Sequence, residues 1–138
     1  MIDSDLRKLF KTCRVIAVVG LSDRPERPSF GVAQYMQAQG YRIIPVNPNA
    51  QEILGEKCYA SLLDIAHPID MVNVFRRSED VLPIAQQAVQ IGAKCLWQQI
   101  GVMNEEADAL AQSHRLISVM DRCLKIEHAR HLASSSST

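Results

Sequence analysis

Basic and hydroxyl side chains gather in one short segment, Ser22–Ser29, which follows an apolar run that ends at Gly20. Its two arginines, Arg24 and Arg27, can each form paired hydrogen bonds with phosphate oxygens. A helix that opens near Ser29 would add free backbone N–H groups and the positive end of its dipole. The segment therefore predicts a site for a phosphate-bearing ligand. The alternative, that both arginines are ordinary solvated surface charges, stays open at this point.

Two features argue against a dinucleotide of the NAD type. The GxGxxG fingerprint is absent, because Leu21 and Ser22 follow Gly20 and the next glycine is Gly31. The second apolar run ends in Val46-Asn47-Pro48, without the carboxylate that an NAD site uses to bind the ribose hydroxyls. A ligand with phosphates and an adenosine that does not need this carboxylate fits better.

The elements that position these residues follow from five short, nearly continuous apolar runs, typical of strands buried on both faces. The runs are Val15–Val19, Tyr41–Val46, Met71–Phe75, Cys95–Trp97 and Leu116–Met120. Helical spacing of apolar residues precedes Gly40 and Gly92, and Asn104 can cap a further helix. The first ten residues also resemble a helix, and Ser61–Ile65 could form a short one.

Alternating strands and helices predict an α/β fold: a Rossmann-like, doubly wound, five-stranded parallel sheet of order 3-2-1-4-5, with helices on both faces. We expect one domain over residues 1–132 and a disordered Ser-rich tail over 133–138. In such a sheet, ligands bind outside the carboxyl ends of the strands. These ends bring together residues 20–23, 47–48, 75–76, 98–101 and 122–123.

Composition narrows the function classes for the 138 residues. Fifteen basic and fifteen acidic residues give a formal net charge of zero, which argues against a nucleic-acid binder. The longest apolar run is too short to span a bilayer and no signal-peptide pattern follows Met1, so we expect a cytoplasmic protein without a membrane partner. The four cysteines lie far apart with no zinc-binding spacing, so no metal site is expected.

Several stretches together resemble a known family. They are RVIAVVGLSDRPERPSFGVAQYMQAQGYRIIPVNPN, MVNVFRRSEDV, QIGAKCLWQQIGV and VMDRCLKIE. Across about residues 5 to 130 the chain resembles the small stand-alone CoA-binding proteins, which are similar to the CoA-binding, Rossmann-like domain of the succinyl-CoA synthetase alpha subunit.

The resemblance implies a coenzyme A site at the same edge of the sheet. The turn Gly20-Leu21-Ser22 would lie against the phosphates, with Arg27 and Ser29 of the long loop. For the 3′-phosphate our own candidates are the two loop arginines, Arg24 and Arg27. Val46, Asn47 and Pro48 would lie near the adenine. The end of the third strand would contribute Phe75, Arg76 and Arg77, and Gln98 and Gly101 would line the pantetheine side.

The resemblance also bears on activity. The synthetase relies on a phosphorylated histidine of a separate ligase domain. In this chain we expect His67, His114, His128 and His131 to lie at the surface or at helix ends. The first hypothesis is therefore a protein that binds coenzyme A or an acyl-CoA without catalysis, as a carrier, a sensor or the partner of an enzyme of acyl-CoA metabolism. One alternative is a small acyl-CoA or nucleotide-dependent transferase that uses residues such as Asp121 or Cys123. Another is a ligand-free protein–protein adaptor.

Overall fold

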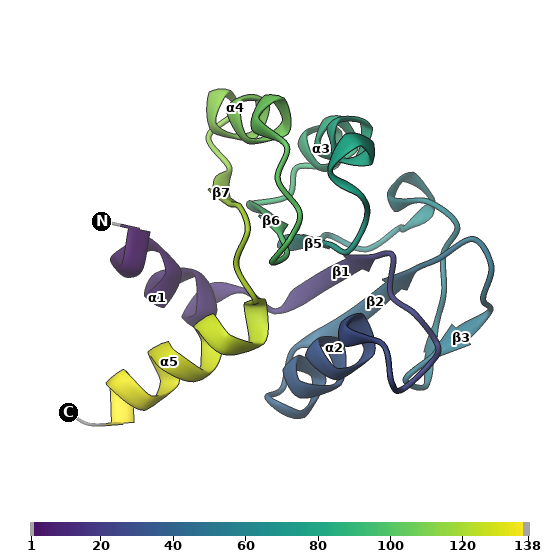
Figure 1. Ribbon diagram of the computed structural model, residues 1–138, viewed down its shortest axis with the longest axis horizontal. Helices are drawn as coiled ribbons and strands as arrows, with labels where there is room; N and C mark the ends of the chain where they lie inside the picture. The colour runs from purple at the N-terminus through teal and green to yellow at the C-terminus, as the bar shows by residue number, and fades with distance from the viewer. Residues whose placement is uncertain (1, 137–138) are drawn as a thin grey trace.

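Five parallel strands form the central sheet of the computed structural model, which describes residues 2–136 (Figure 1). Every neighbouring pair is parallel, and most strand residues are buried because helices cover both faces. The α/β, Rossmann-like class is confirmed. The strands are β1 (Val15–Val19), β2 (Arg42–Val46), β5 (Met71–Val74), β6 (Cys95–Gln98) and β7 (Ile117–Val119).

The order across the sheet is β2-β1-β5-β6-β7, which is 2-1-3-4-5 in chain order. The predicted order 3-2-1-4-5 is therefore wrong for the third strand, β5, which pairs with β1 and not with the outer edge of β2. Asp70, just before β5, stabilises this placement. Its carboxylate accepts hydrogen bonds of 2.9 Å from the backbone N–H groups of both Arg14 and Val15, which ties the start of β5 to the start of β1.

Helices form a layer on each face of the sheet (Figure 1). One apolar core packs beneath α1 (Ile2–Thr12), α2 (Pro28–Ala38) and α5 (Leu124–Ser136), and the other packs beneath α3 (Val81–Gln90) and α4 (Glu105–Ser113). The predicted cap of α4 is confirmed, because the Asn104 side chain accepts from the N–H of Ala107 at 2.9 Å. No helix of the described chain is both long and apolar enough to cross a membrane.

The connection from β2 to β5 contains only small elements. It holds a hairpin of β3 (Glu52–Ile53) and β4 (Glu56–Lys57), then the single 3-10 turn η1 (Leu62–Asp64). A second 3-10 turn, η2 (Ser78–Asp80), precedes α3. The region 61–65 is thus one turn and not a full helix, and its Ser61 hydroxyl caps it by accepting from the N–H of Leu63.

The last helix, α5, has no counterpart in the sequence prediction. Its inner face is formed by Leu124, His128 and His131, all nearly buried, and two of these three count as polar in any apolar pattern. The helix runs through Ser136 and so overlaps the residues assigned to a disordered tail. Residues 137–138 lie outside the described residues, and the tail stays a prediction there.

Candidate functional site

The turn after β1 lies directly against the end of β5. Gly20 has a φ of +88°, and a side-chain carbon there would lie 2.4 Å from the carbonyl oxygen of Phe75 and 2.9 Å from Cδ of Arg76. The Gly20 N–H donates to the carbonyl oxygen of Val46 at 2.9 Å. Only glycine fits this backbone. The ends of β1, β2 and β5 therefore meet with no side chain at position 20 between them.

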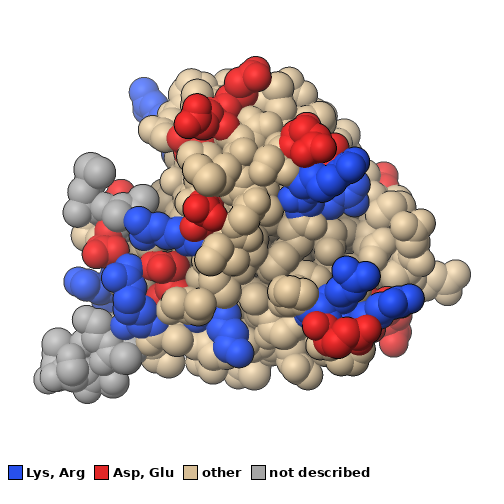
Figure 2. All heavy atoms as spheres, in the orientation of Figure 1, with Lys and Arg blue, Asp and Glu red and all other residues tan. Residues whose placement is uncertain are grey.

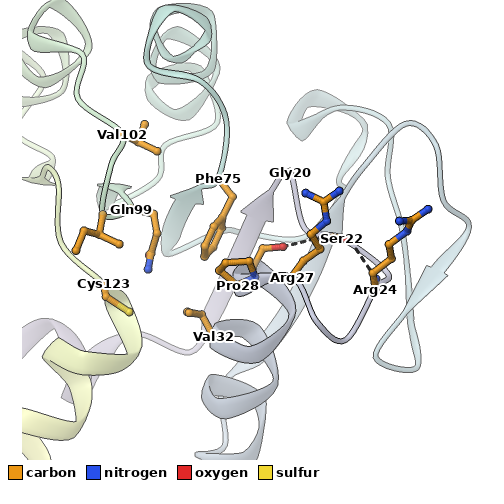
Figure 3. Close-up of a pocket in the computed structure, with 12 residues that line it drawn as sticks. Gly20, Ser22, Arg24, Arg27, Pro28, Val32, Phe75, Gln99, Val102 and Cys123 are labelled. Carbon is orange, nitrogen blue, oxygen red and sulfur yellow. Dashed lines mark hydrogen bonds between the residues drawn. The ribbon is translucent and has the colours of Figure 1, made fainter.

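The long loop that follows is held by its own hydrogen bonds. The N–H of Ser22 donates to the Ser29 hydroxyl at 3.0 Å, and the Ser22 hydroxyl accepts from the N–H of Arg24 at 3.1 Å (Figure 3). The hydroxyls expected to face a phosphate thus also fix the shape of the loop. Arg24 and Arg27 are exposed, and neither guanidinium forms an ion pair within residues 2–136.

A pocket of about 660 Å³ opens beside this loop, between α2, the ends of β5 and β6, and the start of α5 (Figure 3). We call it the main pocket. Its walls are largely apolar, with Val32, Phe75 and Val102, and the two loop arginines stand at one end. The complete lining is Gly20, Ser22, Arg24, Arg27, Pro28, Ser29, Val32, Phe75, Gln99, Ile100, Val102 and Cys123.

A second hollow of about 360 Å³, the side hollow, lies toward α3. Val46 and Pro48 line it, together with Leu62 and residues of α3. Arg76 also lines it, and the stem of this side chain lies over Gly20, so Arg76 stands at the turn between the two hollows. Figure 2 shows two clusters of basic side chains, each with acidic side chains beside it, on opposite sides of a depression in this face. The arrangement suits a ligand with a charged middle.

Three of the predicted site residues are held by the protein itself. The side chain of Leu21 is fully buried in the core. Asn47 donates to the carbonyl oxygen of Leu21 at 2.9 Å and accepts from the N–H of Asn49 at 2.8 Å, so it ties β2 to the loop. Arg77 lies 3.3 Å from the Asp80 carboxylate and lines neither hollow.

Two neighbouring glutamines at the end of β6 lie on opposite faces of the sheet. Gln98 is fully buried on the α4 side, where its amide donates to the carbonyl oxygen of Asn104 at 3.2 Å and accepts from the same residue's N–H at 2.8 Å. Gln99 lies on the opposite face and lines the main pocket. The N–H of Gly101 donates to Asp121 at 2.7 Å. Gln98 and Gly101 thus shape the loop, while Gln99 faces the pocket.

The comparison with family models decides the family. A model described as "CoA binding domain" matches residues 14–129. The chain belongs to this family of CoA-binding domains. The predicted resemblance is therefore confirmed at the level of the family.

Relatives of this CoA-binding domain agree with the match. It is 44% identical over 126 residues to "Uncharacterized protein YneT" of Bacillus subtilis. The aligned residues cover 91% of this chain and 93% of that protein. It is 37% identical over 92 residues to "Acetate--CoA ligase [ADP-forming] II" of Archaeoglobus fulgidus, with 65% of this chain matched to 14% of that protein. A solved structure of a hypothetical protein from Pyrococcus horikoshii superimposes with a TM-score of 0.91 at 40% identity, covering 94% of this chain and 92% of that chain.

The histidines of the CoA-binding domain lie away from the site, and two of them correct the prediction. His128 and His131 are nearly buried on α5 and not at the surface. The Nδ1 atom of His128 is hydrogen-bonded to the Tyr35 hydroxyl at 2.9 Å, and its ring packs edge-on against Phe10 and Tyr41. The prediction failed because it assigned these histidines to a mobile end of the chain, where the structure has a packed helix.

The cysteines of the domain differ in accessibility. Burial raises the pKa of Cys13 to about 12, with a further contribution from Asp70, and burial likewise raises the pKa values of Cys58 and Cys95. Cys123 is partly exposed and lines the main pocket. Across residues 2–136, no three His, Cys, Asp or Glu side chains gather as metal ligands would.

The main pocket also contains residues outside the predicted set. Gln99, Ile100 and Cys123 belong to the strand ends that fold geometry had brought to this edge, but they were not among the site residues. Val32 and Val102 could not be predicted as site residues, because the sequence does not distinguish an apolar side chain in a pocket wall from one in the core.

Proposed function

We propose that this domain binds coenzyme A or an acyl-CoA at the carboxyl edge of its sheet, as a non-catalytic binding, carrier or sensor protein. The observation that carries the proposal is the Gly20 turn, which lies between the main pocket and the side hollow and has Arg24, Arg27 and Arg76 around it. Coenzyme A has the matching layout, with phosphates between an adenosine and a long, largely apolar arm.

The layout favours one orientation. The phosphates would lie by the Gly20 turn, where backbone can approach closely and arginines can pair with them. The adenine would occupy the side hollow beside Val46 and Pro48, where the end of β2 carries no carboxylate for an NAD ribose. The pantetheine arm would run along the apolar walls of the main pocket toward Gln99 and Cys123.

The lining of the main pocket supports binding without catalysis. Its described residues include no His, Asp or Glu that could act as a general base or acid. The carboxylates near the site have structural partners. Glu79 and Asp80, which line the side hollow, lie 3.9 and 3.3 Å from Arg77. Asp121 accepts from the N–H of Gly101 at 2.7 Å, and Glu127 lies 2.7 Å from Arg130. Of the two residues named for the transferase alternative, Cys123 lines the pocket and Asp121 does not, so a transferase would have to use the thiol without a carboxylate or histidine beside it in the lining.

We further propose that the domain works in the cytosol with a second protein, an enzyme of acyl-CoA metabolism, because a carrier or sensor needs one. Balanced charge, with fifteen basic and fifteen acidic residues, supports a small-molecule ligand over nucleic acid or a membrane surface.

Thermal unfolding with coenzyme A, dephospho-CoA, ATP and NAD tests the proposal. A ligand at about a hundred times its dissociation constant stabilises a protein by about 2.7 kcal/mol, which raises the unfolding midpoint by several degrees. Coenzyme A should give this shift, and the Arg24→Ala/Arg27→Ala double variant should lose most of it. The control is Arg42→Ala, at the opposite end of the sheet, which should keep it. No shift with coenzyme A, or an equal shift with NAD, would contradict the proposal.

A further inference from the structure

Gln99 has a polar side chain on the inner wall of the main pocket, and its hydrogen bonds determine which atom of its amide is the oxygen. It is 3% exposed, and its oxygen accepts two hydrogen bonds, from the N–H of Leu124 at 3.3 Å and from the side-chain amide of Asn73 at 3.2 Å. A backbone N–H can only donate, so the amide atom facing Leu124 must be the oxygen.

The second bond gives the same orientation independently. The Asn73 nitrogen also approaches the carbonyl oxygen of Trp97 at 3.4 Å, and a carbonyl can only accept. The amide nitrogen of Asn73 therefore lies between Trp97 and Gln99, and the Gln99 atom that it meets is again the oxygen. The Gln99 nitrogen is left on the other side, where Figure 3 shows it pointing into the space by Cys123 and Phe75.

This nitrogen donates to no residue of the described chain, although the residue is buried. Its neighbours in the pocket wall, Val32, Phe75 and Val102, have apolar side chains and offer no acceptor. Because the nitrogen faces the open pocket, a ligand that supplies an acceptor there can take a direct hydrogen bond from it. The acceptor would be uncharged, because no basic side chain other than the two loop arginines lines this pocket in the described part of the chain.

The donor is also held rigidly. The indole N–H of Trp97 donates to the carbonyl oxygen of Arg122 at 2.8 Å, which fixes the turn before α5 that carries the Leu124 N–H. Little ordering is therefore needed when a ligand arrives, and a preorganised donor contributes more to affinity than a mobile one.

We propose that the Gln99 carboxamide recognises a carbonyl oxygen in the arm of the bound ligand. The inference rests on the proposed function and adds to it a residue that binds the pantetheine or acyl part of the ligand and not its nucleotide part. Two carbonyl sources share this chemistry: the pantetheine amides, present in every form of coenzyme A, and the thioester of an acyl-CoA.

Calorimetric titration of four ligands separates these sources. Adenosine 3′-phosphate 5′-diphosphate has no arm, coenzyme A has the arm, acetyl-CoA adds a thioester carbonyl, and S-ethyl-CoA matches acetyl-CoA in size without that carbonyl. Each dissociation constant is divided by that of the arm-free nucleotide for the same variant, so that general effects on the fold cancel.

Gln99→Glu retains the oxygen that accepts from Leu124 and Asn73, but it replaces the donor with a second carboxylate oxygen and adds a negative charge. Gln99→Met removes the whole amide and serves if the first variant does not fold. Gln98→Met is the matched control, an adjacent glutamine on the other face of the sheet. We expect both Gln99 variants to weaken binding of the armed ligands about tenfold relative to the arm-free nucleotide, the effect of one hydrogen bond.

An equal loss for all three armed ligands assigns the carbonyl to pantetheine, and a loss confined to acetyl-CoA assigns it to the thioester; either result supports the proposal. Unchanged ratios in the Gln99 variants, or the same change in Gln98→Met, would overturn it. If the wild-type protein bound none of the four ligands, the proposed function itself would fail, which the wild-type titrations show before any variant is compared.

Discussion

Gly20 and Phe75 approach each other so closely that a side-chain carbon on Gly20 would lie 2.4 Å from the Phe75 carbonyl oxygen. The contact joins the ends of β1 and β5, the two strands between which the order of the sheet changes direction. Ligands of doubly wound sheets bind at this switch point. The fold thus creates a place where backbone is exposed to a ligand and where no larger residue fits.

Gly20→Ala should therefore destabilise the protein by more than its backbone conformation alone explains. A positive φ costs a non-glycine residue about 1 kcal/mol, and the contact with Phe75 adds strain or forces β5 to move. Gly101→Ala is the matched control, because Gly101 has a φ of +86° with nothing within 4 Å of the added carbon. Urea unfolding of both variants measures the difference, and equal losses would contradict the clash.

Asp70 should make the fold sensitive to acid. Burial alone would raise the pKa of its carboxyl, but the N–H groups of Arg14 and Val15, with Lys94 at 3.6 Å, lower the pKa below its ordinary value. A lowered pKa in the folded state adds stability that is fully present above the unfolded value of about 3.9 and is lost as the pH falls through the folded value.

Asp70→Asn should cost about 1.5–3 kcal/mol at neutral pH, since it weakens charge-assisted hydrogen bonds to two backbone donors. Its stability should also fall less than that of the wild type below about pH 4. Urea unfolding across this range checks both effects. Lys94→Met, which removes only an exposed ion pair, should cost less than about 1 kcal/mol. A larger loss for Lys94→Met than for Asp70→Asn would contradict this account.

The positions of the strands could be predicted because each is a continuous apolar run bounded by polar residues. The edge of the sheet to which β5 adds could not be predicted, since a buried apolar strand suits the free edge of β1 and the outer edge of β2 equally well. One contact that stabilises the observed choice joins the Asp70 carboxylate to the backbone of Arg14, and these residues are 56 positions apart in the sequence. Helix α5 was missed for a related reason, because its inner face contains His128 and His131, which become buried only through aromatic neighbours.

The location of the site was predictable from fold geometry, and the side chains that line it only in part. Alternation along β6 means that Gln98 and Gln99 face opposite sides of the sheet. Which side holds the pocket depends on where α2 and α5 end, and this is a matter of three-dimensional packing. The sequence could therefore indicate the pair of glutamines but not the one that faces the pocket.

His128 should make the protein less stable in mild acid. Burial lowers the pKa of His128, and the nearby His131 lowers it further. Below the unfolded value of about 6.5, the unfolded chain takes up a proton that the folded protein resists, so stability falls as the pH drops from there toward the folded value. Urea unfolding at pH 7.5 and 5.5 should show this fall for the wild type and a smaller one for His128→Gln. The control His114→Gln changes an exposed histidine and should keep the wild-type fall; an identical fall in all three proteins would rule out His128 as its source.

Cys123 should be the thiol that reacts fast in the native protein. Cys13 and Cys95 are buried, and burial raises their pKa values, to about 12 for Cys13, so little thiolate forms there at neutral pH. Titration with a chromogenic disulfide should give one fast equivalent, with the other thiols reacting only after unfolding. Cys123→Ser should abolish the fast phase, whereas Cys58→Ser should retain it.

Since Cys123 lines the main pocket, coenzyme A should slow the fast phase in proportion to its occupancy of the pocket. A fast phase that survives in Cys123→Ser would contradict the assignment of the thiol, and one unaffected by saturating coenzyme A would place the ligand arm outside this pocket.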